Sequence, residues 1–363
     1  CTTFRVTSGA ERTPAMAAHL PSGAPIGRPA RHATGHCSAR MARRLNPRPP
    51  CPYPWGPHPR EADMLIHASR GFSLLLLAAF ALPLRAADPI EAAAAAILER
   101  HAEAPLLVPG ELHGTVEAPA LVATLAARLL DSGALTVALE IPAQEQARLD
   151  AYLASDGSTR AQRELLDGEF RQRAPERSDG RRSRAMFALI EQLRRLRATH
   201  PELHLLAFDD TGVFDHTRSR DALMSDALRA ARAAHPEAKL LVLTGNYHAR
   251  LDQSARARSG DRWIQPPLPM TAQLQDLGAI SIKLSAVEGE QWACRKPTAP
   301  CGVIPLPRPA FAPSSSGLAA SNAATAAEPV RVWSGGTCFH LEIELPRLNA
   351  SEPIALDDAL PAR

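Results

Sequence analysis

Four short apolar runs, separated by stretches with helical spacing, dominate the pattern of hydrophobic and polar positions. The runs hold five or six residues each and predict buried strands: 105–109, 135–139, 203–208 and 239–244. Between them, apolar residues recur at helical spacing over three segments: 118–129, 186–196 and 224–231. Strands that alternate with helices indicate βαβ units. We therefore predict an α/β fold whose mostly parallel sheet has helices on both faces.

The remaining patterned segments predict additions to this sheet. Residues 143–180 are rich in charges and broken by Gly and Pro, and we expect a helical insertion that forms a lid. Residues 279–284 and 338–345 alternate between apolar and polar positions, which predicts half-exposed antiparallel strands at the sheet edge near the C-terminus. Residues 308–329 are rich in Pro, Ser and Ala and predict a linker-like loop. The expected parts are an α/β domain over 88–307, this loop, and a C-terminal edge strand with a tail over 330–363.

The first 87 residues differ from the rest in composition. Residues 1–63 are rich in Pro, Arg, Ala and Gly, which predicts a disordered extension or a start site assigned too far upstream. Residues 64–87 begin with a short segment that holds one Arg, continue with an apolar stretch of 14 residues and end in small residues, which is typical of a secretory signal peptide. An uncleaved anchor or a buried helix is the alternative. Because the stretch is short and no Cys follows it, we expect a periplasmic or secreted protein without a lipid anchor or a stable membrane span after processing.

The charge of the folded part differs from that of the whole chain. The chain has 41 Lys and Arg against 38 Asp and Glu, but 11 of the basic residues and three of the acidic ones precede residue 88. Residues 88–363 therefore hold 30 basic and 35 acidic residues, which argues against a nucleic-acid binder. The hydrophobic content of 45% and charged content of 22% exclude a coiled coil and a wholly disordered chain.

Export would place the cysteines in an oxidising compartment. Cys294 and Cys301 can close a short loop and are the first choice for a disulfide, although either could pair with Cys338 instead. This spacing lacks the second Cys or His pair of a zinc site. We expect Trp292 to pack under the disulfide.

Ionisable residues follow all four predicted strands. The carboxyl ends of parallel strands lie on one edge of the sheet, where ligands bind. We therefore expect these side chains to converge on one cleft: Glu111, His113, Glu117, Glu140, Asp209, Asp210 and His248. Crowded carboxylates raise one another's pKa unless a cation joins them.

Two kinds of chemistry suit this set. A divalent ion such as Mn, Zn or Co could be held by His and carboxylate ligands, namely Glu111, His113, Glu140, His248 and Asp209. Alternatively, His113 oriented by Glu111 could act as a general base on water. Other interpretations are structural: Glu117 could be a charge at a helix N-terminus, and the Arg-rich residues 179–184 a solvated helix start or a phosphate or carboxylate contact.

Short motifs at these positions resemble one superfamily. They are Gly-Glu-Leu-His-Gly-Thr at 110–115, the acid Glu140 at a strand end, Arg-Asp-Ala-Leu-Met at 220–224, and Gly-Asn-Tyr-His-Ala at 245–249. In order, spacing and strand context they resemble the superfamily that joins erythromycin-esterase-like hydrolases, Tiki/TraB-type proteins and ChaN-type haem-binding proteins. One residue separates Glu111 from His113, as in the ChaN-like and Tiki-like branches, whereas the esterases usually have two. The resemblance covers about residues 105–285.

The resemblance implies a hydrolase-like protein whose catalytic residues are His113, Glu111, His248 and Glu140. Water activated by this cluster, with or without a divalent metal, would act on an ester, lactone or amide of a small molecule or peptide. Contacts with the substrate would come from Glu117, Arg220, Asn246 and Tyr247. The alternative is a non-catalytic haem-binding protein for iron uptake, with His113, His248 or Tyr247 as axial ligand and a possible homodimer around the haem. A purely structural relative is a third interpretation.

Overall fold

The computed structural model describes residues 88–168, 174–209, 218–253, 257–259, 262–295, 299–306 and 329–354. The predicted N-terminal extension, the signal peptide, Asp210 and nearly all of the linker-like loop lie outside these residues. None of the helices in the described ranges is long and apolar enough to cross a membrane.

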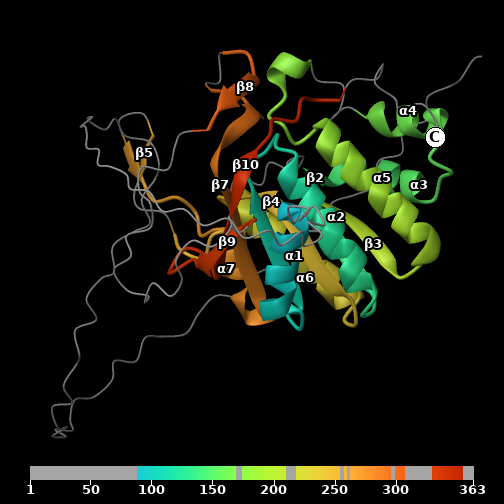
Figure 1. The fold of residues 1–363 in the computed structure, drawn as a ribbon, viewed down its shortest axis with the longest axis horizontal. Helices are drawn as coiled ribbons and strands as arrows, with labels where there is room; N and C mark the ends of the chain where they lie inside the picture. Colours follow the sequence, from blue (N-terminus) through green and yellow to red (C-terminus); the bar gives the residue numbers. More distant parts are fainter. Residues whose placement is uncertain are drawn as a thin grey trace, which may run out of the picture. The chain divides into compact units, whose positions relative to one another are not determined.

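The chain forms helices and strands in alternation, as the hydrophobic pattern predicts (Figure 1). The helices are α1 (Pro89–His101), α2 (Glu117–Leu130), α3 (Gln146–Leu153), α4 (Thr159–Leu166), α5 (Arg184–Thr199), α6 (Arg220–Ala234) and α7 (Met270–Gln273), with short 3-10 turns at Ala143–Glu145, Pro175–Arg177 and Gln275–Leu277. The strands are β1 (Leu106–Glu111), β2 (Leu135–Pro142), β3 (Leu203–Asp209), β4 (Lys239–Gly245), β5 (Ala257–Ser259), β6 (Arg262–Ile264), β7 (Ala279–Ala293), β8 (Gly302–Pro305), β9 (Arg331–Ser334) and β10 (Leu341–Leu348). The four apolar runs are β1 to β4, and the three helical stripes are α2, α5 and α6.

The main sheet is mostly parallel, which confirms the predicted fold class. Its order is β3-β2-β4-β1-β7-β10-β9, and β8 pairs with β7 off this path. Every neighbouring pair from β3 to β10 is parallel. The antiparallel strands are β9 against β10 and β8 against β7.

These antiparallel pairs confirm the antiparallel strands expected near the C-terminus, but residues 279–284 do not lie at the sheet edge as predicted. β7 lies inside the sheet between β1 and β10, and both pairings are parallel. Their polar-apolar alternation has another cause. One face packs into the core through residues such as Ile282 and Ile343, whereas the other carries the Lys283–Glu342 ion pair. The alternation arises because only one face of these strands is packed into the core. A repeat of two residues indicates burial on one face and does not indicate whether strands are parallel or antiparallel.

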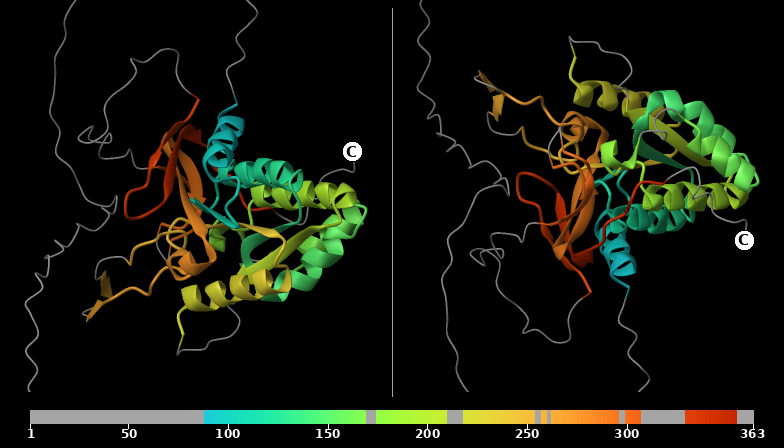
Figure 2. Two further views of the ribbon diagram at one scale, coloured as in Figure 1. Left: turned by 90° about the horizontal axis from the view of Figure 1, so that it is seen from below. Right: turned by 90° about the horizontal axis from the view of Figure 1, so that it is seen from above.

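Helices cover both faces of the β1–β4 region (Figure 2). Alternate strand residues divide between two hydrophobic clusters, because successive side chains of a strand point to opposite faces. Leu107 and Leu241 pack with α1, α2 and α5, whereas Leu106, Val108 and Leu240 pack with α6 and α7. The near-continuous apolar strands of the sequence result from this burial on both sides.

The predicted insertion after β2 is helical, but its described helices do not form a lid. α3 packs against β3 and α5, and α4 packs against α3, so both helices lie at the β3 end of the sheet (Figure 2). The side chain of Gln146 accepts a hydrogen bond from the Ala207 amide at 2.7 Å and donates one to the Leu205 carbonyl at 2.8 Å. These bonds satisfy the open edge of β3, which would otherwise be free to pair with another strand. Residues 174–182 then return to the carboxyl edge of the sheet.

Candidate functional site

A pocket of about 360 Å³ opens at the carboxyl ends of β1 and β4. The ends of the two strands supply Glu111, His113, Asn246, Tyr247 and His248 to its lining. Asp179 from the returning segment, and Gln291, Ala293 and Cys294 from β7 and the residue after it, complete its wall. The predicted convergence at one edge of the sheet thus brings most of the candidate residues together.

His113 lies between two carboxylates. Its Nδ1 is 2.8 Å from Oε1 of Glu111, and its Nε2 is 3.6 Å from Oε1 of Glu140. Gly245 allows this approach, since a Cβ at that position would lie 2.9 Å from Nε2 of His113. Burial alone would lower the pKa of His113, but the two carboxylates outweigh it and raise this pKa to about 10. His113 is therefore an imidazolium at neutral pH.

Glu140 is a buried anion held by three donors. Its carboxylate accepts hydrogen bonds from the Thr244 hydroxyl at 2.7 Å, the Gly245 amide at 2.8 Å and the Arg220 guanidinium at 2.6 Å. Burial would raise the pKa of Glu140, but the His113 and Arg220 cations hold it well below its usual range. The carboxylate thus stays charged and keeps the proton on His113.

His248 belongs to a second carboxylate-histidine pair. Its Nδ1 is 2.8 Å from Oδ1 of Asp221, and its Nε2 is 2.8 Å from Nη1 of Arg220. Because a guanidinium can only donate, this contact assigns the lone pair to Nε2 and the ring proton to Nδ1, on the side of Asp221. The Met270 amide donates to the same Asp221 oxygen at 2.8 Å, which fixes the carboxylate from the other side.

Two arginines converge on Asp209, which is fully buried at the end of β3. Arg220, at the start of α6, donates to its two oxygens at 2.8 Å each. Arg181 donates to Oδ2 of Asp209 at 2.9 Å and also binds Asp179 at 2.7 Å. The Arg-rich run therefore makes carboxylate contacts, the alternative to a solvated helix start. These guanidinium groups are the cations that crowded carboxylates require.

Glu117 does not join the pocket, contrary to our expectation. It begins α2, and its carboxylate accepts hydrogen bonds from the amide of Asn349 at 3.0 Å and from its side chain at 2.7 Å. This ties α2 to the segment that follows β10. Asn246 and Tyr247 do line the pocket, and the Tyr247 ring lies edge-on to His248 with 5.4 Å between centroids.

Three polar residues of the site were absent from our predicted set. Asp179 and Arg181 lie on a segment without periodicity, and no strand or helix pattern places that segment beside β1. Asp221 was noted only as part of the Arg220–Asp221 motif. Its position at the first turn of α6 could have indicated its role, because an acid there faces the strand ends that α6 follows.

The predicted metal ligands do not fit a divalent ion. The donor oxygens of Glu140 and Asp209 accept hydrogen bonds from Arg220 and Arg181, and Nε2 of His248 accepts one from Arg220. A cation placed among these ligands would meet two guanidinium groups and the His113 imidazolium. Among the described residues, no group of three or more His, Cys, Asp or Glu is arranged to hold a metal.

These histidines are also unsuited to axial ligation of a haem iron. Both nitrogens of His248 and the Nδ1 of His113 are already hydrogen-bonded, and Nε2 of His113 faces Glu140. An axial ligand needs a ring nitrogen with a lone pair directed at the iron.

Comparisons with known proteins give distant likenesses. No protein-family model matches this chain, and no curated protein matches it. Among solved structures, an erythromycin esterase variant in its open conformation is 13% identical, with a TM-score of 0.39, over 72% of this chain and 94% of that chain. A Bacillus cereus protein is 11% identical, with a TM-score of 0.43, over 75% of this chain and 96% of its own. The haem-binding ChaN of Campylobacter jejuni is 13% identical, with a TM-score of 0.30, over 54% and 85%.

These matches include the kinds of protein that the sequence motifs resemble. An erythromycin esterase and a ChaN protein are both among them. Identities this low and TM-scores below 0.5 transfer no activity to this chain. The function must therefore be inferred from the site itself.

Proposed function

We propose that this chain is a hydrolase of a carboxylic ester, lactone or amide, without a catalytic metal. One observation carries the proposal: two histidines line one pocket, each is oriented through Nδ1 by a carboxylate, and their Nε2 atoms differ, because His113 lies between two carboxylates whereas His248 accepts from Arg220. A proton donor and a proton acceptor in the same site suit acid-base chemistry.

His248 is the base for the attacking water. Its neutral ring can accept a proton at Nε2, and Asp221 stabilises the imidazolium that forms. In the resting site Arg220 occupies that lone pair at 2.8 Å. The base becomes available when the attacking water takes the place of Arg220 Nη1.

His113 stabilises the developing negative charge on the carbonyl oxygen. The Nε2 proton of His113, which lines the pocket, has Oε1 of Glu140 at 3.6 Å, beyond hydrogen-bond distance. A substrate carbonyl oxygen can accept that proton in a hydrogen bond, and the positive ring stabilises the oxyanion. This assignment replaces the predicted role of His113 as a base, because its raised pKa keeps it protonated.

The pH dependence of turnover tests this assignment. His113 has a pKa raised to about 10, so its charged form is present below that pH and is lost as the pH rises through it. We expect kcat for an activated ester to hold up to about pH 10 and then fall. A panel of p-nitrophenyl esters, lactones and aryl amides, each corrected for spontaneous hydrolysis, provides the measurement. A rate that begins to rise only near pH 10 would instead identify His113 as the base.

Removal of metal ions should leave turnover unchanged. The carboxylates that a metal would need are bound to arginines, so dialysis against EDTA is expected to change kcat less than about twofold. The control is the same protein dialysed without chelator. A loss of more than about tenfold that Mn or Zn restores would show that a metal takes part.

A further inference from the structure

β7 extends well beyond the carboxyl edge of the sheet. It has 15 residues, but its pairing with β1 ends at Lys283 and its pairing with β10 ends at Gly289. The rest of β7 pairs with β8 in a two-stranded ribbon that rises past the sheet (Figure 1). We call residues 286–295 and 299–306 the arm, which includes the last four residues of β7 alongside β10. Gln291, Ala293 and Cys294 of the arm form one wall of the pocket.

Trp292 of the arm binds the turn that carries His113. Its backbone amide donates to the carbonyl of Gly114 at 3.0 Å. Gly114 has a positive φ of 75°, and a Cβ there would lie 2.3 Å from the Trp292 carbonyl oxygen. The two backbones are thus in the closest contact that glycine permits.

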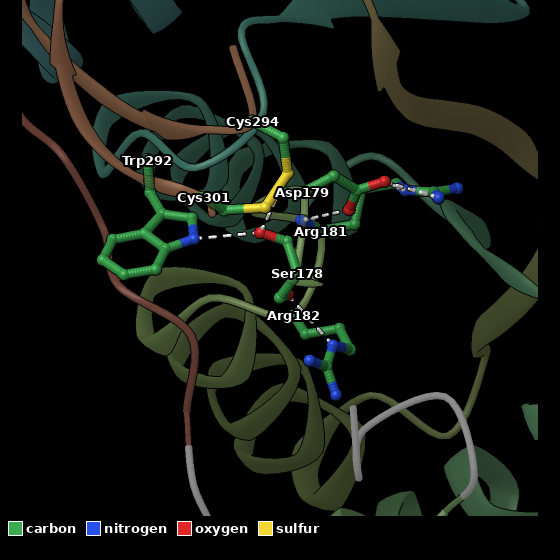
Figure 3. The surroundings of a disulfide bond; sticks show 7 residues. All are labelled: Ser178, Asp179, Arg181, Arg182, Trp292, Cys294 and Cys301. Atoms are coloured by element: carbon green, nitrogen blue, oxygen red, sulfur yellow. Dashed lines mark hydrogen bonds and ion pairs between the residues drawn. A yellow bond between two sulfur atoms is a disulfide. The ribbon is translucent and has the colours of Figure 1, made fainter. Parts of the chain in front are cut away.

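The same tryptophan binds the segment that carries Asp179 (Figure 3). Its indole Nε1 donates to the carbonyl of Ser178 at 2.9 Å. Asp179 follows directly and accepts from Arg181, which also reaches Asp209. One side chain thereby connects the arm to the charged wall of the pocket.

The Cys294–Cys301 disulfide closes the arm, which confirms the predicted pairing. It lies just beyond the last paired residues, Ala293 and Gly302. The Cys301 amide donates to the Glu176 carbonyl at 2.8 Å. Sγ of Cys294 lies 3.7 Å from the Ser178 carbonyl oxygen (Figure 3). A two-stranded ribbon is only marginally stable alone, so the arm needs this bond to keep its shape.

The two segments that the arm binds also contact each other. Gly180 has a φ of 90°, and a Cβ on it would lie 2.5 Å from the amide nitrogen of Gly114 and 2.9 Å from the carbonyl carbon of His113. The 113–114 turn, the 176–180 segment and the arm therefore form one backbone cluster. Because the arm contacts the other two, a displacement of the arm reaches His113 directly.

We propose that Trp292 and the Cys294–Cys301 disulfide are positioning residues that hold His113 and Asp179 in place for the proposed hydrolysis. This inference rests on the proposed function for its effect on rate, but the contacts can be tested without any substrate. Hydrolytic sites tolerate little misplacement, since a shift of about 1 Å can cost about 100-fold in rate.

Three perturbations of the full chain test the proposal. Dithiothreitol reduces the disulfide to two thiols and is itself oxidised to a cyclic disulfide. The double variant Cys294→Ser/Cys301→Ser makes the same change permanent. Trp292→Phe keeps the backbone amide and an aromatic ring but removes the indole donor to Ser178. The matched control is Val287→Ala, an exposed position of the arm outside the pocket lining.

Two readouts are taken after circular dichroism has confirmed folding. The first is the exchange rate of the His113 Nδ1 proton, which the bond to Glu111 should protect and 15N-edited NMR can observe. The second is kcat and KM for the best ester of the panel. We expect the proton to exchange at least about tenfold faster and kcat to fall about tenfold in the reduced protein, with a smaller effect of the same sign in Trp292→Phe. Reoxidation should restore the slow proton exchange and the original kcat in the wild type but not in the Ser variant.

Unchanged proton exchange in both the reduced protein and Trp292→Phe would overturn the proposal. If the double Ser variant does not fold, the reduced wild type and Trp292→Phe still decide the question. Faster exchange in a protein that hydrolyses nothing in the panel would support the positioning contacts and contradict the proposed function. An equal effect of Val287→Ala would show general loosening of the arm and would also overturn the assignment.

Discussion

Replacement of His113 by Asn should lower kcat for a carboxylic ester about 100- to 1,000-fold, the usual cost of losing one oxyanion donor. The Asn amide can still donate to Glu111, as Nδ1 does now at 2.8 Å, but it has no group at the position of Nε2. The other residues of the pocket lining, such as Asn246 and Tyr247, are unchanged, so KM should change much less than kcat. Steady-state kinetics at pH 7 to 9, where His113 is charged, provide the measurement.

Two further variants make this result specific. His113→Gln places an amide donor nearer to the position of Nε2 and should recover part of the rate that His113→Asn loses. His204→Gln is the control, since His204 stacks on His235 with 4.1 Å between ring centroids, outside the pocket lining. Equal rates for wild type and His113→Asn would remove the oxyanion role from His113.

The sequence predicts the strands and their ends because both depend on local patterns. The apolar runs of β1 to β4 result from burial on both faces of the sheet, and the first ionisable residue after each run lies at the carboxyl end of its strand or in the turn that follows. Parallel strands share a carboxyl edge, so Glu111, Glu140, Asp209 and His248 could be placed together without a structure. To predict their convergence it is enough to know that the strands are parallel, and the hydrophobic pattern already predicts a parallel sheet.

Contacts between segments far apart in the chain could not be predicted in this way. Arg181 binds Asp209 from a segment that has no helical or strand periodicity. Trp292 binds Gly114 because β7 continues past the carboxyl edge of the sheet. Glu117 resembled a pocket residue because it follows β1, yet Asn349 binds it from the end of the chain. In each case the sequence did not show which distant residue the side chain binds, although it placed the residue correctly within or between the predicted strands and helices.

The partners also change the chemistry that the residue types predict. Three carboxylates and two histidines suggest a metal site when only the ligands are counted. Arg220 reverses this interpretation, because it binds Glu140, Asp209 and the lone pair of His248 at once. The positive charge that the carboxylates need is supplied by protein side chains, and this leaves the histidines for acid and base chemistry.

The last consequence concerns Asp221, whose replacement by Asn should lower kcat about 1,000- to 10,000-fold, as expected when the acid that orients a catalytic histidine is lost. If the Asn oxygen faces His248, the hydrogen bond persists but the charge that stabilises the imidazolium is gone. If the Asn amide faces it instead, Nδ1 must accept, and the proton moves to Nε2, where it meets the N–H of Arg220. The first arrangement weakens the base, and the second removes it.

The tautomer of His248 separates this effect from simple unfolding. 15N NMR should find the ring proton on Nδ1 in the wild type, and loss of that state in Asp221→Asn should accompany the loss of rate. Asp226→Asn is the matched control, because Asp226 lies on the same helix, pairs with Arg218 and has a side chain that is 54% exposed. We expect that control to keep full activity. A folded Asp221→Asn with wild-type kcat would show that His248 needs no orienting acid and would exclude it as the base proposed above.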